Sequence, residues 1–434
     1  MENPAKQQTE ILVDHLFRHE AGKIVATLVR IFGSRYLDLA EDVVQDTMIR
    51  ALQLWPFQGI PENPEGWLTL TAKRRVIDLL RREASLADKI TEIERNLPQV
   101  TRGEEGPGDE DKMDDELSLI FMCCHPAIPR ESQVALTLKT ACGFSIGEVA
   151  RAFLIQQATI AQRIVRAKRQ IRERGIVFEI PIADQLSERL NAVLQVLYLL
   201  FNEGHSATQG ENLVRDDFCE EAIRLGLLLA RHPRTGRPEV HALLALMMLQ
   251  AARLPARTKP DGAIALLADQ DRSQWNQRLI GLGMRHLAQS AGGSEMTSYH
   301  LQAEIAAIHA TANSDAETDW ARITTLYDQL HQIEPSPIVA LNRAVALSRW
   351  RGPWAGINAL NEIKHHPMLS NYHLLPAVLA DLWNRAGDAT KAAEYYSAAL
   401  NCPCTEPERR LLQSRLENER ALCKAEEGKR NKRK

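Results

Sequence analysis

Residues 144–172 are FSIGEVARAFLIQQATIAQRIVRAKRQIR, and their pattern decides the fold of this part of the chain. Ser145 and Glu148 have the three-residue spacing of a capping box, which predicts the start of a helix. A short break at residues 154–156 separates this helix from a second one. The second helix has one continuous apolar stripe, formed by Ile160, Ile164, Ala167 and Ile171. The pattern therefore predicts two consecutive helices joined by a short turn.

The polar face of the second helix carries glutamine and basic side chains. The side chains expected on that face are Gln157, Thr159, Gln162, Arg163, Arg166 and Lys168. Arginine and glutamine near the start of a recognition helix form bidentate hydrogen bonds with guanine and adenine in the major groove, and the later basic residues are placed for phosphates. The alternative is an amphipathic helical hairpin with a solvated basic face. The rest of the chain favours DNA binding.

The net charge of −3 over 434 residues does not by itself indicate a nucleic-acid partner, but the distribution of charge does. Residues 73–82 hold five basic side chains and one aspartate. Residues 163–174 hold six basic side chains and one glutamate. Two basic clusters on otherwise near-neutral segments are typical of phosphate contact.

Residues 66–82 predict a helix with separate basic and apolar faces. At 100° per residue, the arginines fall on the side of Trp67. The expected core side chains, on another side, are Leu70, Val76, Ile77 and Leu80. The Trp67 ring could stack on an unpaired base or pack under the neighbouring loop, and the pattern leaves both open.

Residues 38–51 predict a second helix, which is acidic. Its apolar side carries Leu39, Val43 and Thr47. Its exposed faces are expected to carry Glu41, Asp42, Gln45 and Asp46. A solvated acidic helix would explain this segment taken alone. Its position before the basic helix and the helix-turn-helix favours a specific function.

The order of these segments resembles the extracytoplasmic-function (ECF) group of sigma factors. Domain 2 of that family carries the pattern AEDxxQ(D/E)…W(L)xxxAxxxxxDxxRR, and domain 4 ends in a helix-turn-helix. In this chain the matching segments begin at Ala40-Glu41-Asp42, at Trp67-Leu68 and at Asp78, and the resemblance covers residues 10–175. It implies an all-α protein that acts with RNA polymerase.

The resemblance also implies roles for individual residues. Docking on the coiled-coil clamp of the polymerase β′ subunit would fall to Glu41, Asp42, Gln45, Asp46 and Arg50. The −10 promoter element would be melted and held by the loop at residues 57–63 and by Trp67, Lys73, Arg74, Arg75, Arg81 and Arg82. The −35 element would be read by Gln157, Thr159, Gln162, Arg163, Arg166 and Lys168. The implied partners are promoter DNA and core RNA polymerase, through its β′ clamp and β flap. Because Arg74 stands where such factors commonly have Asn, the base preference near the −10 element does not carry over.

Composition and resemblance together predict the domain organisation. The expected parts are sigma domain 2 at 10–84, a flexible acidic linker at 85–116, sigma domain 4 at 117–175, a helical extension at 186–320, a tetratricopeptide-like region at 321–423 and a basic disordered tail at 424–434. No segment has the period-two pattern of a strand, so the chain is expected to be all-α.

The chain also resembles a sigma-factor subgroup with a long tetratricopeptide-like C-terminal extension. The segments that carry this resemblance are 123–126, 197–204 and 269–273. One repeat is expected from Ala377, Ala380, Gly387, Ala392, Tyr396, Ala399 and Pro403, with a degenerate neighbour at 338–363. The polar groups at 202–205 and 269–272 form either a buried hydrogen-bond network at a helix junction or a contact surface for the sigma domains or a ligand.

Seven cysteines, an odd number spread over the chain without a secretory signal, predict reduced thiols and a cytoplasmic protein. Neither Cys123-Cys124-His125 nor Cys402-Pro403-Cys404 has zinc-site spacing, so buried thiols are favoured over a metal. No cofactor is expected. No apolar run reaches the roughly 18 residues of a membrane span, so no membrane partner is expected either.

Three functions remain open. The favoured one is a sigma factor whose extension contacts the sigma domains or the polymerase and sets activity in cis. The second is a DNA-binding regulator with a helical-repeat sensor, which would not need the acidic helix. The third is an enzyme on a helical solenoid, which is disfavoured because the sequence has no glycine-rich phosphate loop, nucleophile elbow or metal-spaced histidines. Binding of core RNA polymerase separates the first from the other two.

Overall fold

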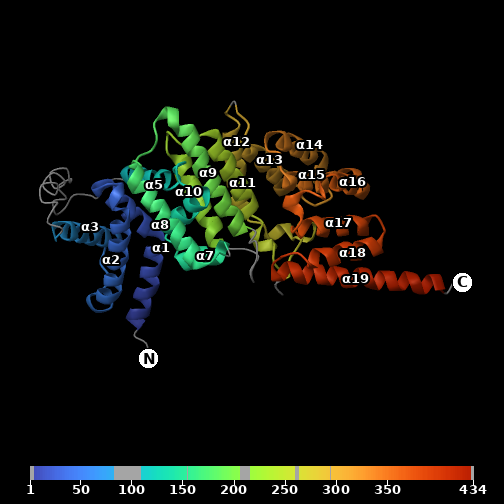
Figure 1. Ribbon diagram of the computed structural model, residues 1–434, viewed down its shortest axis with the longest axis horizontal. Helices are drawn as coiled ribbons and strands as arrows, with labels where there is room; N and C mark the ends of the chain where they lie inside the picture. The colour runs from blue at the N-terminus through green and yellow to red at the C-terminus, as the bar shows by residue number, and fades with distance from the viewer. Residues whose placement is uncertain are drawn as a thin grey trace. The chain divides into compact units, whose positions relative to one another are not determined.

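The computed structural model describes residues 4–82, 109–153, 155–205, 216–259, 263–293 and 295–431. Within them the extended pairing is limited to an isolated antiparallel bridge between Thr258 and Ile264. Helices form the rest of the regular structure (Figure 1), so the prediction of an all-α fold is confirmed. The chain divides into two compact units, residues 1–199 and residues 200–434.

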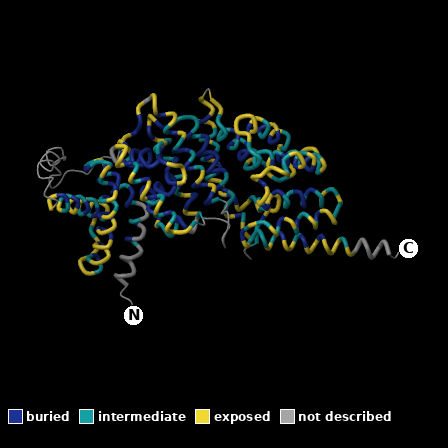
Figure 2. Tube along the Cα trace, in the orientation of Figure 1, coloured by how far each residue is buried: buried dark blue, intermediate teal, exposed yellow. Residues whose placement is uncertain are grey.

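The first unit contains both segments predicted to be sigma domains. Its helices are α1 (Pro4–Phe32), η1 (Ser34–Tyr36), α2 (Leu37–Gln58), α3 (Pro64–Arg82), α5 (Asp109–Cys123), α6 (Arg130–Thr140), α7 (Ile146–Phe153), α8 (Gln157–Arg174) and most of α9 (Ala183–His205). α1 packs against α2, α3 and α5, and α6 packs against α8. Figure 2 shows buried and exposed positions alternating along α2 and α3, as amphipathic helices require.

A glycine allows α1 and the end of α6 to approach closely. A Cβ atom at Gly22 would lie 2.2 Å from the carbonyl oxygen of Ala141. That distance is far below van der Waals contact, and the clashing atom is backbone, which cannot rotate away. The absent side chain of Gly22 therefore sets how near these two segments lie.

Gly22→Ala is expected to destabilise the protein by about 1–3 kcal/mol, because overpacking forces the backbone to shift. Urea unfolding followed by circular dichroism measures the change. The matched control is Gly281→Ala, in the interior of a helix of the second unit, where a Cβ meets nothing within 4 Å. The control variant should be slightly more stable than wild type, since alanine has a higher helix propensity than glycine. Equal losses in both variants would contradict the assignment.

The predicted flexible linker, residues 85–116, is corrected at its C-terminal end. Residues 83–108 lie outside the described residues, and α5 begins at Asp109. Asp115 and Glu116 are buried. Arg30 of α1 donates from Nε to Asp115 Oδ2 over 2.9 Å, across 85 positions of sequence. An acidic composition predicts solvent exposure, but a distant arginine supplies the counter-charge that lets this carboxylate be buried.

The two consecutive helices predicted at 144–172 are present as α7 and α8. The Ser145 amide donates to Glu148 Oε2 over 2.8 Å and the Glu148 amide donates to Ser145 Oγ over 3.1 Å, so the capping box is confirmed. The predicted stripe of three isoleucines and Ala167 is buried. α8 ends at Gly175, which has a left-handed backbone (φ 60°).

α9 changes the predicted boundary between the sigma region and the extension. The extension was expected to begin at residue 186, but the helix begins at Ala183 and its residues up to Leu199 belong to the first unit. Arg189 donates from Nη2 to the carbonyl oxygen of Phe121 over 2.8 Å, which attaches α9 to the end of α5. Its apolar positions from Leu186 to Leu197 are buried in a helical pattern. The first unit therefore extends about one helix beyond the predicted domain 4.

The second unit consists of helices that follow one another in the chain. After the end of α9 they are α10 (Asp216–Arg231), α11 (Pro238–Ala251), η2 (Leu254–Ala256), η3 (Leu267–Asp269), η4 (Arg272–Gln274), α12 (Gln277–Ser290), α13 (Ser298–Thr311), α14 (Trp320–Ile333), α15 (Pro337–Arg351), α16 (Pro353–Ile363), η5 (Pro367–Leu369), α17 (Leu374–Arg385), α18 (Ala389–Leu400) and α19 (Glu406–Asn431). From α13 onward each helix packs against the next. α11 is apolar on nearly all sides, because it lies between α10, α12 and α13.

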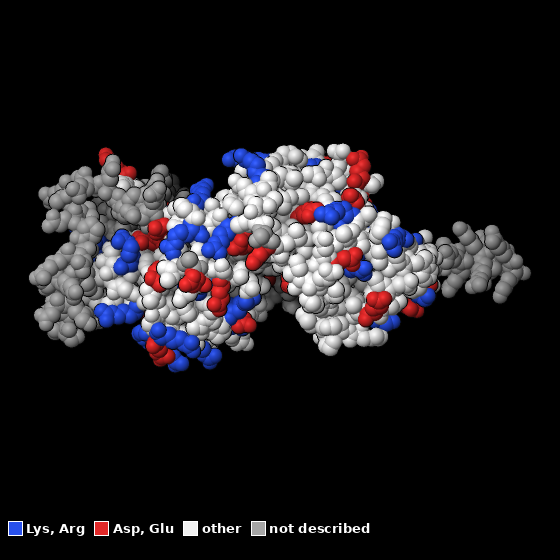
Figure 3. Space-filling view, turned by 90° about the horizontal axis from the view of Figure 1, so that it is seen from above, with Lys and Arg blue, Asp and Glu red and all other residues white. Residues whose placement is uncertain are grey.

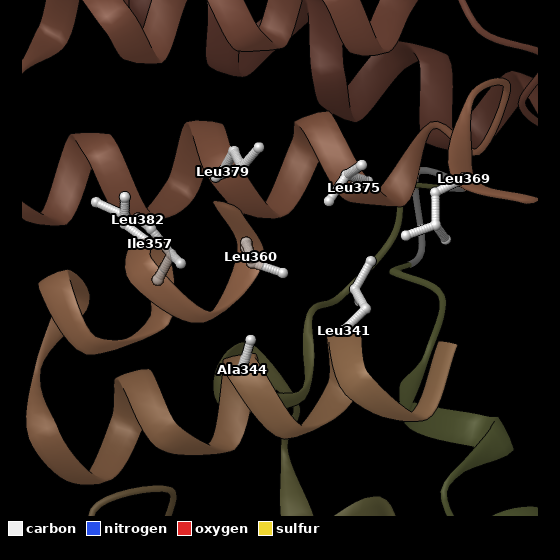
Figure 4. Packing of buried hydrophobic residues seen from close by; sticks show 8 residues of the cluster. All are labelled: Leu341, Ala344, Ile357, Leu360, Leu369, Leu375, Leu379 and Leu382. Atoms are coloured by element: carbon white, nitrogen blue, oxygen red, sulfur yellow. The ribbon is translucent and has the colours of Figure 1, made fainter. Parts of the chain in front are cut away.

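Two helix pairs fall where the repeat and its degenerate neighbour were expected, α17–α18 and α15–α16. Gly352 and Gly387 each have positive φ, 92° and 84°, at the turn inside their pair, a conformation that favours glycine. A shared apolar core joins the pairs (Figure 4), formed by Leu341, Ala344, Ile357, Leu360, Leu369, Leu375, Leu379 and Leu382. Small residues of the predicted repeat, including Ala380, Ala392 and Ala399, are fully buried between helices.

The basic tail predicted to be disordered from Lys424 is corrected as well. α19 continues to Asn431, and residues 432–434 lie outside the described residues. Lysine, arginine and glutamate have good helix propensity, and extending an existing helix avoids the cost of nucleation. The composition was therefore compatible with a helix as well as with a solvated tail.

Candidate polymerase and nucleic-acid interface

α2 presents an acidic face because its apolar residues fix its orientation. The buried side includes Ala40, Val43, Val44 and Thr47, and the Thr47 hydroxyl donates to the carbonyl oxygen of Val43 over 2.7 Å. The opposite positions Asp42, Gln45, Asp46 and Arg50 are exposed, as predicted. Four of the five residues predicted to dock on the polymerase are therefore accessible to a partner.

Asp42 lies in an unfavourable electrostatic environment. Partial burial raises the pKa of its carboxyl, and the neighbouring carboxylates of Asp38, Glu41 and Asp46 raise it further, against the opposing effect of Lys168. An acid whose pKa is raised in the folded state stabilises the fold only at acid pH, and this contribution is lost as pH rises through the folded pKa. At neutral pH the ionised Asp42 therefore acts against folding.

Glu41 differs from the expectation of an exposed docking residue. Lys168 of α8 lies with Nζ 2.7 Å from Glu41 Oε2 and 2.9 Å from Asp38 Oδ1. The Thr140 hydroxyl at the end of α6 donates to the other Glu41 oxygen. The side chains of Glu41 and Lys168 are only 12% and 13% exposed. Lys168, predicted to face phosphates, instead faces α2 in this structure, so its expected placement is corrected.

Sequence reasoning did not single out Asp38 and Thr140, which complete this contact. Asp38 and Glu41 are three positions apart on one helix and so share a face. That spacing was a signal for a paired acidic surface. No signal in the sequence identified Thr140 as a partner, because it is 99 positions from Glu41.

α3 carries the predicted basic face. Its buried stripe consists of Leu68, Ala72, Val76 and Leu80. Arg74, Arg75, Arg81 and Arg82 are exposed, as expected. Leu70, expected in the core, is 41% exposed and that prediction is wrong. The buried stripe follows a four-residue spacing from Leu68, which places Leu70 on another side of the helix.

Lys73 is less accessible than its arginine neighbours. It is half-buried, and burial lowers the pKa of its ammonium group, with a further decrease from nearby Arg30. Arg30 belongs to α1, where it pairs with Asp115, and α1 packs against α3. The side of α3 that carries Lys73 therefore faces α1. Among the basic residues of α3, the exposed arginines are therefore better placed than Lys73 to meet DNA.

Trp67 takes the packing role that the sequence left open. Its ring meets the buried Trp55 ring edge-on, with centroids 5.4 Å apart and an angle of 66° between planes. Exposed apolar groups nevertheless lie in the last turn of α2 and in the loop that follows it. Phe57 is 85% exposed and Ile60 is exposed beside it. The predicted loop at 57–63 thus presents an aromatic ring to solvent that the sequence had not singled out.

The start of α8 is the exposed part of the expected recognition helix. Gln157, Gln162 and Arg166 are exposed, and Thr159 and Arg163 are half-buried. On the face shown in Figure 3, small groups of blue and red side chains are scattered among white residues, which cover most of the described surface. Contact with nucleic acid therefore depends on local clusters such as those of α3 and α8 rather than on the net charge.

The polar segments singled out in the second unit divide between core and surface. Arg257 donates to the carbonyl oxygen of His205, and its guanidinium lies 3.2 Å from His205 Nδ1. Arg272 stacks on Trp275 and donates to the carbonyl oxygen of His309 over 2.8 Å. Burial lowers the pKa of Arg253 to about 10 and, with Arg253 and Arg272 nearby, lowers the pKa of His309 to about 3.

Among the remaining polar groups of those segments, Glu203 is buried and Gln270 is half-buried. Asn202, Asp269 and Asp271 are exposed. The Asp271 carboxylate accepts a hydrogen bond from the Ser273 amide over 3.0 Å and caps η4. The predicted buried network therefore holds for the histidine and arginines, while the aspartates do not take part in it.

The cysteines of the first unit are buried thiols. Cys123, Cys124 and Cys142 are all buried, and burial raises the pKa of the Cys124 thiol to about 12. A thiol with so high a pKa is a poor nucleophile and a poor metal ligand at neutral pH. Cys402 and Cys404 are half-buried. Among the described residues, no group of three His, Cys, Asp or Glu side chains is arranged to hold a metal ion.

Comparison with known proteins assigns the N-terminal segment. Residues 16–85, which span most of α1 together with α2 and α3, match sigma-70 region 2. Residues 189–291 match a family of unknown function, DUF6596. No solved structure matches the chain.

Two relatives extend this result. The uncharacterized protein R00370 of Rhizobium meliloti (strain 1021) is 38% identical over 385 residues, covering 87% of this chain and 88% of the relative, so the chain belongs to the same family as R00370. The ECF RNA polymerase sigma factor SigE of Mycolicibacterium smegmatis is 24% identical over 161 residues, which are 37% of this chain and 60% of that protein. The region 2 domain and this likeness support a sigma factor role for the chain.

Among the residues that the structure describes, no helix is long and apolar enough to cross a membrane.

Proposed function

We propose that this chain is a sigma factor that binds core RNA polymerase and directs promoter-specific transcription initiation. The observation that carries the proposal is the geometry of the region 2 segment. There α2 exposes acidic side chains and α3 exposes arginines, with the aromatic loop at 57–63 between them. In such an arrangement the acidic face suits a cationic partner and the basic face suits anionic DNA. In this role the chain positions other macromolecules in the cytoplasm and has no reaction of its own to catalyse.

The acidic face of α2 is the proposed polymerase site. Asp42, Gln45, Asp46 and Arg50 are exposed and would meet the β′ clamp. Partial burial raises the pKa of Asp42, and the like charges around it raise it further. A cluster of acidic side chains that destabilises the fold is typical of a site where a cationic partner binds and neutralises the charge. The helices around α8 would meet the β flap.

α3 and its preceding loop are the proposed site for the −10 element. Melted DNA offers unstacked bases and a phosphate backbone. The exposed ring of Phe57 suits stacking on a base, and the exposed guanidinium groups of Arg74, Arg75, Arg81 and Arg82 suit phosphates. Trp67 would support this surface through its contact with Trp55.

The N-terminal half of α8 is the proposed reader of the −35 element. Gln162 and Arg166 are exposed on the side opposite the buried isoleucines, Gln157 is exposed in the first turn of the helix, and Thr159 and Arg163 are half-buried. Glutamine and arginine there match the adenine and guanine contacts that recognition helices make in the major groove.

The second unit is proposed to be a tetratricopeptide-like extension that regulates activity in cis. The separation of Gly352 and Gly387 is close to the roughly 34-residue period of tetratricopeptide repeats. The likeness to R00370 covers 87% of this chain, so both the region 2 segment and the extension have counterparts in that relative. A regulator carried on the same chain acts at high effective concentration without a separate partner.

Run-off transcription tests the proposal. Purified core polymerase, the full chain and a promoter library are expected to yield transcripts that depend on the chain and on promoter sequence. A protease site introduced between residues 205 and 216 then allows the same protein to be assayed before and after cleavage, with the site in place both times. Cleavage should change promoter-dependent transcription several-fold if the extension acts in cis. No co-purification with core polymerase and no transcript from any library member would contradict the sigma factor role.

A further inference from the structure

The acidic face of α2 is contacted by another helix of the same unit. Lys168 of α8 lies within 2.9 Å of Asp38 Oδ1 and 2.7 Å of Glu41 Oε2, and Arg172 Nη1 lies 3.8 Å from Asp38 Oδ2. With the Thr140 hydroxyl on its other oxygen, Glu41 is held on both sides. One end of the surface proposed to bind polymerase is thus covered by α8, the helix proposed to read the −35 element, and by the end of α6.

The ion pair between Lys168 and Glu41 is largely shielded from solvent. Lys168 and Glu41 are both almost completely covered, whereas surface ion pairs leave their charges in water. Burial alone would lower the pKa of Lys168, but the charge of Glu41 and the hydrogen bonds that Lys168 donates to Asp38 and Glu41 outweigh this effect, so the pKa lies above its usual value. A lysine with a raised pKa stabilises the contact at every pH below its unfolded value, and this stabilisation is lost only as pH rises through the folded pKa.

Beside this ion pair, the end of α6 packs against α1. Gly22 of α1 approaches the carbonyl oxygen of Ala141, directly after Thr140. Lys139 lies over the ring of Phe17 at 5.9 Å. The end of α6 therefore meets α1 and Glu41, while α8 meets η1 and, through Lys168, the carboxylates at the start of α2.

We propose that docking of α8 onto α2 is an autoinhibitory contact, in which Lys168 occupies the carboxylates that the polymerase clamp must bind. The proposal rests on the sigma factor role. A clamp that recognises an acidic face must present cationic groups, and Lys168 is such a group supplied by the chain itself. Asp42, Asp46 and Arg50 remain exposed, so polymerase first meets the open end of the face and then displaces α8 from the other end.

This competition has a defined consequence for binding. Only the molecules with α8 undocked offer the whole surface, so the apparent affinity for polymerase is reduced by the fraction that is open. Removing the lysine charge leaves Glu41 without its cationic partner and favours undocking. The exposed start of α8, including Gln162 and Arg166, does not take part in this contact.

The test compares Lys168→Met with Arg169→Met in the full chain, using core polymerase without DNA. Methionine keeps most of the aliphatic stem while removing the charge. Arg169 is the matched control, because it is the next residue of α8, is exposed and pairs within its own helix, with Glu173 at 3.5 Å. Fluorescence anisotropy of the labelled chain measures the dissociation constant. The K168M variant is expected to bind about tenfold more tightly than wild type, and R169M should bind as wild type does.

Hydrogen exchange keeps the proposal testable if K168M folds poorly. In the wild-type protein, adding core polymerase should increase amide exchange at the end of α6 and in α8 around Lys168, because both lose their cover. Lys168→Arg, which retains the charge, should restore wild-type affinity. Wild-type affinity in K168M, or no increase in exchange when polymerase binds, would overturn autoinhibition and leave the sigma factor role standing. Failure of the wild-type protein and of K168M alike to bind polymerase would instead overturn the sigma factor role, and the inference with it.

Discussion

Replacing both Asp42 and Asp46 with lysine is expected to abolish binding of the chain to core RNA polymerase. Both side chains are exposed on α2, one helical turn apart, so the change reverses the charge of the accessible half of the docking face. Close like charges across an interface cost several kcal/mol, which is enough to lower affinity more than a hundredfold. Co-purification with tagged core enzyme and anisotropy titration measure the loss.

The fold should survive this change, because both side chains are exposed and the ionised carboxylate of Asp42 does not stabilise it. Since neighbouring acids and partial burial raise the pKa of Asp42, its neutral analogue Asp42→Asn should slightly increase the free energy of unfolding at neutral pH. This gain should shrink as pH falls towards 3.8, the ordinary pKa, where the aspartate is itself protonated. Asp42→Asn is thus expected to weaken polymerase binding while stabilising the protein, the signature of a residue kept for a partner.

The control for the double reversal is Asp184→Lys with Glu188→Lys on α9. These residues are exposed acids with the same four-residue spacing, in the same unit but on another helix. The control should bind polymerase nearly as wild type does. Normal co-purification of the Asp42 and Asp46 variant with core enzyme would remove the assignment of α2 as the docking helix.

Replacing Arg163 and Arg166 with alanine is expected to weaken promoter binding by about 2–4 kcal/mol, or roughly 30- to 1,000-fold, because each bidentate base contact contributes about 1–3 kcal/mol of discrimination. Arg166 is exposed and Arg163 half-buried, so the larger share should come from Arg166. The loss should be concentrated at particular base pairs of the −35 element. Gel-shift titration of the polymerase complex against point-mutated promoters, at fixed salt, resolves this pattern.

Arg169→Ala and Arg174→Ala provide the comparison, since both arginines are exposed nearer the C-terminal end of α8. Any contribution they make should be to phosphates and therefore similar for all promoter sequences. If transcription from the cognate promoter is unchanged in the Arg163 and Arg166 variant, the recognition-helix assignment is wrong. Polymerase binding without DNA should stay normal in both pairs of variants.

Local sequence patterns determined which segments are helices and where several of them begin. The capping box of α7 and the buried stripe of α8 follow from spacing alone, because a 3.6-residue period and a cap are properties of a single helix. The acidic face of α2 and the exposed arginines of α3 were also predictable. Leu70 shows the limit of this reasoning. Periodicity shows that a helix has an apolar side, but the neighbouring helices decide the centre of that side.

Only the tertiary structure decided which charges are available. Lys168 and Glu41 each belong to a predicted polar face, yet they lie 127 positions apart and neutralise each other. Arg30 and Asp115 do the same across 85 positions, which turns part of an expected linker into a buried helix. From sequence alone a charged side chain is expected at the surface, because a charged group favours water. Whether a counter-charge replaces that water depends on how distant helices pack, since an ion pair forms only within a few ångströms.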